Sequence, residues 1–265
     1  MVEDPAPFSP VELEWLHKST FVRAVECHDQ LASTNERAME WAAAEDLPLP
    51  ALIVARSQTA GRGRGGNHWW SREGSLTFSL VLEPQAWGTV GAYWPKVSLT
   101  VGLAVCLALE PLARSCRPKL KWPNDVYLED RKICGVLIEV PQRAAGRVVI
   151  GIGINVNNSF DAAPSPQRQT AVSLSQVTGQ THRLASILQA VLVHLDEQLS
   201  VLAACPSDLL ERWAAYCMLR DRRIVWDRGV ETHTGLCLGI DAQGALLLKT
   251  DDAIHAIHGG VVRPL

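Results

Sequence analysis

The spacing of apolar and polar residues divides the chain into segments of two kinds. Helical spacing or helix-forming composition marks residues 11–18, 37–44, 93–113, 184–199 and 207–217. Continuous or alternating apolar runs predict strands at 51–55, 75–82, 119–122, 126–128, 133–140 and 148–157, with a further candidate at 21–25. Residues 160–170 are rich in Pro, Ala and Gln and predict a loop.

The pattern changes near residue 218. Four short runs typical of strands follow, at 223–226, 234–240, 245–249 and 253–257, with turns rich in Asp and Gly between them. The sequence therefore predicts an α+β protein with two domains. The larger occupies residues 1–218, and a compact β module occupies residues 219–265.

One stretch fits neither pattern. Gly61-Arg62-Gly63-Arg64-Gly65-Gly66 places four glycines in six residues between two predicted strands. A glycine in a helix or strand interior costs about 0.5–1 kcal/mol relative to alanine, so this density suits a backbone that approaches a ligand or needs positive φ. The two arginines supply planar cations suited to a phosphate or carboxylate. We interpret the stretch as an anion-binding loop.

Three other interpretations of this loop are weaker. Gly61, Gly63 and Gly66 match the dinucleotide-binding spacing, but that motif opens a helix and none is predicted after Gly66. A kinase glycine loop does lie between strands, but the chain has no His-Arg-Asp or Asp-Phe-Gly sequence. An Arg-Gly-Gly RNA-binding tail is terminal and disordered, whereas this loop is central and is followed by Trp69 and Trp70.

Composition narrows the class of protein. Apolar residues make up 47% of the 265 residues, which allows a sizeable core, and the net charge of −3 provides no bulk basic field for DNA or an anionic membrane. The seven cysteines are odd in number and lack Cys-x-x-Cys spacing, which argues against a disulfide framework or a zinc site. We identify neither a membrane-spanning run nor a signal pattern in residues 1–10, and we expect a cytoplasmic protein.

Two smaller features have alternative interpretations. Ser33-Thr34-Asn35 is followed by Glu36, so Ser33 and Glu36 have the spacing of a capping box. The same two hydroxyls and amide would also satisfy a ureido ring, which has one acceptor and two donors. Lysine is scarce, with six against 19 arginines, yet three lysines fall in one 14-residue window, at 119, 121 and 132. The lysine at 121 is either a structural ion pair or part of a site. Gly151 and Gly153 alternate in an apolar run and leave room on one face.

Four motifs follow one another along the chain. They are Ser33-Thr34-Asn35, Gln58-x-x-Gly61-Arg62-Gly63-Arg64-Gly65-Gly66-x-x-Trp69, Lys121-Trp122-Pro123-Asn124-Asp125, and Arg131-Lys132-x-x-Gly135-Val136-Leu137-Ile138-Glu139 with Gly151-Ile152-Gly153-Ile154-Asn155-Val156. Each motif alone is weak, but their order is specific. In these motifs, and over nearly its whole length, the chain resembles the biotin–protein ligases.

The resemblance implies a mixed-sheet catalytic domain of the biotin/lipoate ligase type at 1–218 and an SH3-like barrel at 219–265. It implies ATP and biotin as substrates, with Mg²⁺, no dedicated protein metal site, and biotinyl-5′-AMP as intermediate. The biotinyl group would then pass to a lysine of the biotin carboxyl carrier domain of acetyl-CoA carboxylase or a related carboxylase.

The resemblance also implies roles for individual residues. Lys132, Arg64 and Asp125 are the expected catalytic residues. The expected biotin-binding residues are Ser33, Thr34, Asn35, Gln58, Gly61, Arg62, Gly63, Arg64, Lys132 and Gly135. The expected nucleotide-binding residues are Trp69, Lys121, Asn124, Asn155 and Arg263.

The chain departs from many bacterial relatives at two points. Gly65 and Asn67 stand where arginine is common, which bears on how the loop is ordered. The first motif begins at residue 33, which leaves no room for the helix-turn-helix of the bifunctional members, so no DNA binding is expected. Family members include dimers, so the resemblance allows a homodimer.

Two other functions compete with biotin ligation. A lipoate or octanoate ligase of the same fold would not need Ser33-Thr34-Asn35, since a dithiolane lacks the polar groups of a ureido ring. A biotin-responsive binding module without catalysis would not need Arg62, Arg64 and Lys132 together. A labelled-biotin transfer assay separates all three.

Overall fold

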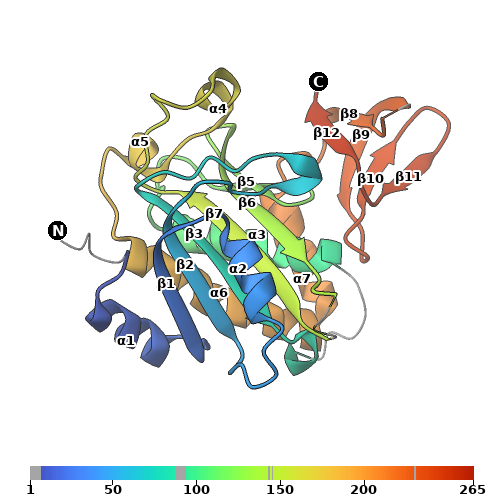
Figure 1. The fold of residues 1–265 in the computed structure, drawn as a ribbon. Coiled ribbons are helices and arrows are strands. Elements are labelled where there is room, and N and C mark those ends of the chain that lie inside the picture. Colours follow the sequence, from blue (N-terminus) through green and yellow to red (C-terminus); the bar gives the residue numbers. More distant parts are fainter. Residues whose placement is uncertain (1–6, 88–93, 143, 145, 230) are drawn as a thin grey trace.

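A seven-stranded mixed sheet and a five-stranded antiparallel sheet form the two parts of the molecule (Figure 1). The structure, a computed structural model, describes residues 7–87, 94–142, 144, 146–229 and 231–265. The larger sheet has the order β1 (Ala24–Leu31), β2 (Ala51–Gln58), β3 (Ser75–Leu82), β7 (Val148–Asn155), β6 (Arg131–Glu139), β5 (Asp125–Leu128) and β4 (Lys119–Lys121). Only β1 and β2 pair in parallel among these neighbours. The predicted α+β class with a mixed sheet is confirmed.

Helices cover both faces of the larger sheet (Figure 1). The longer helices are α1 (Pro10–Ser19), α2 (Thr34–Trp41), α3 (Trp94–Leu109), α6 (Leu184–Ala204) and α7 (Pro206–Tyr216). On one face, Leu52 and Val54 of β2 belong to the main core with α3 and α6. On the other face, Ile53 packs with Ala38 of α2 in a second, smaller core. Because both faces are covered, β3 and β7 are buried along their whole length, and β7 is a nearly continuous apolar run.

Helix α6 corrects one expectation from the sequence. It is a helix long and apolar enough to cross a membrane by length and composition, although the sequence had shown us no such run. Leu188, Val191, Leu192 and Leu195 are all fully buried inside the fold, so this apolar stripe serves the core between α6 and α3.

Three further expectations were wrong in detail. The strand expected at 21–25 begins at Ala24 instead, because β1 is a polar edge strand with a weak hydrophobic signal. The loop expected at 160–170 contains the short helix α4 (Ser165–Thr170), and α5 (Leu174–Thr178) follows it. Two short 3₁₀ segments, η1 (Arg64–Gly66) and η2 (Pro84–Trp87), were not expected.

The smaller sheet contains one more strand than the sequence indicated. Its order is β11 (Ile254–Ile257), β10 (Leu246–Lys249), β9 (Thr232–Ile240), β8 (Arg223–Asp227) and β12 (Val261–Pro264). The missed strand, β12, is a four-residue edge strand that ends in proline and pairs only with β8. The division at 1–218 and 219–265 stays a prediction.

Two contacts join the β4 edge of the larger sheet to the smaller sheet and to the segment just before it. The buried Trp122 donates its indole N–H to the carbonyl of Gly244 at 3.0 Å. The backbone N–H of Met218 donates to the carbonyl of Leu120 at 2.9 Å. Residues of β12 and of the loop that follows β2 line one cavity, so both parts of the molecule contribute to it.

Candidate active site

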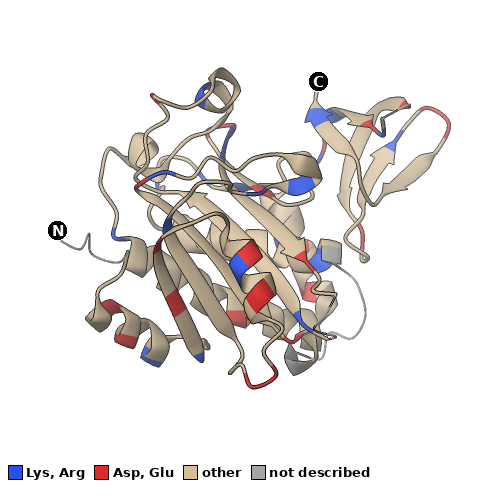
Figure 2. Cartoon of the chain, viewed as in Figure 1, with Lys and Arg blue, Asp and Glu red and all other residues tan. Residues whose placement is uncertain are grey.

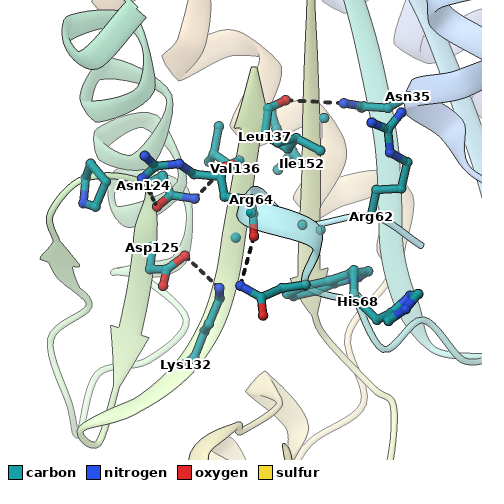
Figure 3. A pocket seen from close by; sticks show the side chains of 18 of the residues that line it. Asn35, Arg62, Arg64, His68, Asn124, Asp125, Lys132, Val136, Leu137 and Ile152 are labelled. Atoms are coloured by element: carbon teal, nitrogen blue, oxygen red, sulfur yellow. Dashed lines mark hydrogen bonds and ion pairs between the residues drawn. The ribbon is translucent and has the colours of Figure 1, made fainter. Parts of the chain in front are cut away.

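A cavity of about 480 Å³ lies between the start of α2, the 58–70 loop and strands β4–β7 (Figure 3). Most residues expected from the sequence to form the site line it. They are Ser33, Thr34, Asn35, Gln58, Arg62, Gly63, Arg64, Trp69, Lys121, Asn124, Asp125, Lys132 and Gly135. The smaller sheet also contributes Gly260, Val261 and Val262 to the lining, which the sequence did not suggest.

Three of the expected residues do not line the cavity that the described residues form. Gly61 is needed for loop packing, since a Cβ there would lie 2.6 Å from the carbonyl oxygen of Trp69. Asn155 is buried and donates to the carbonyl of Lys132 at 3.5 Å, so it contacts the backbone behind the cavity. Arg263 is exposed on β12, next to the lining residue Val262. Their expected ligand contacts stay predictions.

A residue of strand β2 provides the side-chain hydrogen bond at the first turn of α2. Ser33 is the N-cap, but its side chain makes no capping hydrogen bond, so the capping-box interpretation is wrong. Instead, the side-chain oxygen of Gln58 accepts from the backbone N–H of Thr34 at 2.7 Å and lies 3.1 Å from its hydroxyl. Gln58 is the last residue of β2, and its side chain reaches the first turn of α2. The partner of this turn is therefore Gln58, a residue distant in sequence, and not Ser33 as the local spacing had indicated.

Ser79 lies behind the polar end of the cavity, outside its lining, and contacts two residues of that end. Its hydroxyl is fully buried and lies 2.8 Å from the hydroxyl of Thr34 and 2.6 Å from Oδ1 of Asn35. Ser79 was missed at the sequence level. A signal was present, because polar residues alternate at 75, 77 and 79 within a strand that is otherwise apolar. Buried polar groups are rarely left without partners, so such alternation indicates a polar site on one face.

Glycines on β7 make room for this end. Gly151 and Gly153 lie opposite Ser79 and Thr77 on β3. A Cβ on Gly151 would lie 2.0 Å from Oδ1 of Asn35, and a Cβ on Gly153 would lie 2.3 Å from the indole ring of Trp69. The space predicted on this face is therefore taken by Asn35 and Trp69, two of the expected site residues.

Lys132 and Arg64 lie at the end of the cavity opposite Asn35, whereas Arg62 lies beside Asn35 (Figure 3). Nζ of Lys132 lies 2.6 Å from Oδ1 of Asp125 and 5.9 Å from the centre of the Trp69 ring. Nη1 of Arg64 donates to Oδ1 of Asn124 at 3.2 Å, and Asn124 in turn donates to the carbonyl of Val136 at 2.7 Å. These contacts direct a lysine and an arginine to one region, where they would attract an anionic ligand.

Lys121 lies toward the β12 side of this cationic end. Its ammonium donates to the hydroxyl of Tyr127 at 3.2 Å and lies 5.1 Å from the centre of that ring. Burial lowers the pKa of Lys121, the nearby Asp125 opposes this, and the positive charge of Arg263 lowers it further. No ion pair to Lys121 is found within the described ranges. The structural ion-pair interpretation is therefore not supported.

The glycine–arginine loop folds back on itself. The backbone N–H of Gly63 donates to the carbonyl of Asn67 at 2.7 Å, and the backbones of Arg62 and His68 form an isolated antiparallel β-bridge. Gly65 has φ +62° in this turn, a conformation that glycine adopts more readily than arginine. Glycine at position 65, where many relatives have arginine, therefore fits the observed backbone.

Comparison with known proteins decides the family. A sequence model of the biotin/lipoate A/B protein ligase family matches residues 28–155, and one of the biotin protein ligase C-terminal domain matches residues 227–262. The bifunctional ligase/repressor BirA of Bacillus subtilis is 32% identical over 97% of this chain and 79% of its own length. The biotin–[acetyl-CoA-carboxylase] ligase of Paracoccus denitrificans is 33% identical over 82% of this chain and 90% of its own length.

This chain belongs to the biotin protein ligase family. A solved structure agrees: that of the biotin protein ligase from Aquifex aeolicus in complex with biotin and ATP has a TM-score of 0.79 and 29% identity. The similarity covers 92% of this chain and 99% of the Aquifex chain. The biotin protein ligase from Leishmania major shares the fold, with a TM-score of 0.61 and 22% identity.

The use of Mg²⁺ stays a prediction, and the residues of the cavity can be tested for their fit to this ion. No group of three or more His, Cys, Asp or Glu residues that could hold a metal occurs in the part of the chain that the structure describes. Asp125 is a carboxylate in the cavity lining, and it is already paired with Lys132. Mg²⁺ at nucleotide sites is commonly held by one or two carboxylates together with phosphates and water.

Proposed function

We propose that this protein activates biotin with ATP and transfers it to a lysine of the biotin carboxyl carrier domain of acetyl-CoA carboxylase or a related carboxylase. In the first step a carboxylate oxygen of biotin attacks the α-phosphorus of ATP, giving biotinyl-5′-AMP and releasing pyrophosphate. In the second step the amine of the carrier lysine attacks the acyl carbon, an amide forms, and AMP leaves. The cytoplasm is the compartment where we expect the reaction.

One observation carries this proposal: a single cavity joins a buried polar end to an end that holds Lys132 and Arg64. Ser33, Thr34 and Asn35 line the first end. Their hydroxyls and amide match a small ring that both donates and accepts hydrogen bonds. Lys132 and Arg64 line the second end, where a carboxylate and a phosphate must meet. Two anions approach each other readily only if cations are positioned in advance.

The proposed catalytic roles follow from these positions. Lys132 neutralises the biotin carboxylate and afterwards the acyl oxygen, while Arg62 and Arg64 bind the acyl-phosphate linkage. Trp69 and Asn124 contact the nucleotide. Asp125, which is paired with Lys132 in this structure, either contacts the incoming carrier lysine or holds part of the Mg²⁺ shell. When bound with ATP, Mg²⁺ would offset charge on the phosphates.

A transfer assay tests the proposal directly. The protein is incubated with Mg-ATP, labelled biotin and a biotin carboxyl carrier domain, with a carrier whose target lysine is replaced by alanine as control. We expect label on the intact carrier only, and biotinyl-5′-AMP when the carrier is omitted. Transfer of lipoate or octanoate in place of biotin would contradict the proposal, as would biotin binding without adenylate formation.

Assembly and DNA binding are separate parts of this proposal. We expect no DNA binding by this chain, whose net charge of −3 provides no bulk basic field. A homodimer is allowed by the family resemblance and stays a prediction. Sedimentation with and without biotin and ATP measures the assembly, and a salt-titrated DNA gel shift measures the affinity for DNA.

A further inference from the structure

Glu139 lies at the end of β6 and outside the cavity lining, yet it contacts two residues that line the cavity. Its Oε2 accepts from Nδ2 of Asn35 at 2.9 Å. Its Oε1 accepts from Nη2 of Arg62 at 2.8 Å. One carboxylate therefore joins the buried polar end of the cavity to the glycine–arginine loop. The sequence marked Glu139 only as part of a motif, without a role.

The contact with Asn35 fixes the orientation of an amide. Asn35 has a donor end and an acceptor end, and turning it over would exchange the two. Glu139 accepts only, and so does the carbonyl of Leu137, which lies 3.4 Å from Nδ2 of Asn35. Both oxygens therefore select the orientation in which Oδ1 of Asn35 meets the hydroxyl of Ser79 at 2.6 Å.

The contact with Arg62 anchors a cation while leaving it usable. Glu139 engages Nη2 of Arg62, and the guanidinium makes no other hydrogen bond among the residues that the structure describes. Its remaining N–H groups are available to a ligand, since the side chain is 42% exposed and lines the cavity. An anchored arginine loses less rotamer freedom on binding than a free one, which favours the bound state.

We propose that Glu139 is a positioning residue that presets Asn35 for the acyl substrate and Arg62 for the acyl-phosphate. This inference rests on the proposed biotin-activating function and deepens it. Because the carboxylate serves both partners, a neutral glutamine at this position serves only one of them. Its carbonyl oxygen can accept from Asn35, but its amide then presents donors to Arg62, which also only donates.

Two substitutions separate the two contacts. Glu139→Ala removes both, and we expect biotin affinity measured by calorimetry without ATP to fall about tenfold, with dissociation of biotinyl-5′-AMP about tenfold faster, the scale of one charge-assisted hydrogen bond at each end. Glu139→Gln should keep biotin affinity within about twofold of the wild-type value and still release the adenylate about tenfold faster. Thermal unfolding of each variant reports any general loss of structure.

A double substitution tests the assigned partner. If Glu139 acts through Arg62, adenylate dissociation from Glu139→Gln/Arg62→Ala should equal that from Arg62→Ala alone. Glu129→Gln is the matched control, since it removes an exposed carboxylate 3.0 Å from Arg131 at the other end of β6 and should change neither measurement.

The failure of this inference is distinguishable from failure of the proposed function. If the wild-type protein neither binds biotin nor forms the adenylate, the proposed function is wrong. If the wild-type protein does both and Glu139→Ala matches it, the positioning role is wrong. Equal losses of biotin affinity in Glu139→Gln and Glu139→Ala would contradict the division of labour between the two oxygens.

Discussion

The two ends of the cavity differ in burial and in the contacts that hold their side chains. Ser33, Thr34 and Asn35 are 3%, 4% and 3% exposed and lie on a helix start packed against two central strands. Lys132, at the other end, has a side chain 31% exposed and is held by an ion pair with Asp125. Close packing restricts the side chains of the first end, where Asn35 also donates to the carboxylate of Glu139, whereas Lys132 is positioned mainly by charge.

This difference suits the two tasks of the proposed site, which are recognition of a ring and stabilisation of reacting anions. A ring of defined shape is recognised best by groups that cannot move, since each unmet hydrogen bond in a buried site costs about 1–3 kcal/mol. Reacting anions change charge and geometry during the reaction, so solvent-accessible cations on a loop and a strand suit them better. Figure 2 shows that acidic and basic residues both occur along the outer helices α1 and α2.

The largest expected effect tests the cationic end. Lys132→Ala removes a positioned charge, and we expect adenylate formation in a pyrophosphate-release assay to slow by roughly 10²–10³. Biotin affinity without ATP should fall much less. Lys119→Ala, a lysine of β4 that does not line the cavity, is the control. A near-normal rate for Lys132→Ala would remove this residue from the catalytic role.

The next effect tests the rigid end. Gly151→Ala places a methyl group where Oδ1 of Asn35 lies, 2.0 Å from the ideal Cβ, and an overpacked core costs about 1–3 kcal/mol. We expect calorimetry to show biotin binding weakened by about tenfold or more, with the affinity for ATP little changed. Gly259→Ala, where a Cβ meets nothing within 4 Å, is the control. Unchanged biotin binding would show that this end tolerates movement.

A smaller effect is expected at the loop. Arg64→Ala removes the contact with Asn124 and a cation facing the adenylate, so biotinyl-5′-AMP should dissociate about tenfold faster. Stopped-flow fluorescence of the nearby tryptophans measures this rate. Arg114→Ala, in an exposed turn after α3, should leave it unchanged. If Arg64→Ala retained the adenylate as long as the wild-type protein, Arg64 would not bind the acyl-phosphate as proposed.

The smallest effect concerns Lys121, whose partly buried ammonium lies on the β12 side of the cavity. The pKa of Lys121 in the folded protein is lowered below its ordinary value of 10.5. At a pH between these two pKa values, the unfolded chain still binds a proton that the folded chain has released. Stability against denaturant should therefore rise with pH through that window, and Lys121→Met should flatten the rise.

Two charged neighbours act on the pKa of Lys121: Asp125 opposes the shift and Arg263 adds to it. Tyr127, which accepts a hydrogen bond from Lys121, has its own pKa raised by burial. The comparison with Lys119→Met, measured at the same pH values, removes the contributions that the two variants share. Parallel pH profiles for Lys121→Met and the wild-type protein would contradict a lowered pKa at Lys121.

The two ends also differ in how far sequence predicted them. Arg62 and Arg64 stand in a glycine-rich stretch whose composition alone indicates an anion site. Ser79 belongs to a buried strand and carries no motif, so only its alternation with residues 75 and 77 hinted at a role. Gln58 lies 24 positions from Thr34, and no local spacing relates them. Pairings of this kind depend on which strands become neighbours in the sheet.

By itself the sequence determined the elements with strong periodicity and the family, because these depend on residue type and local order; the anion-binding role of the loop stays a prediction. Tertiary structure alone decided that Glu139 meets Asn35 and Arg62 across more than 70 positions, that α6 lies inside the fold, and that β12 borders the cavity. Such contacts depend on the order of strands in the sheet and on which helices pack against each face of it. The local sequence pattern is compatible with more than one strand order and more than one packing of helices, so it does not decide between them.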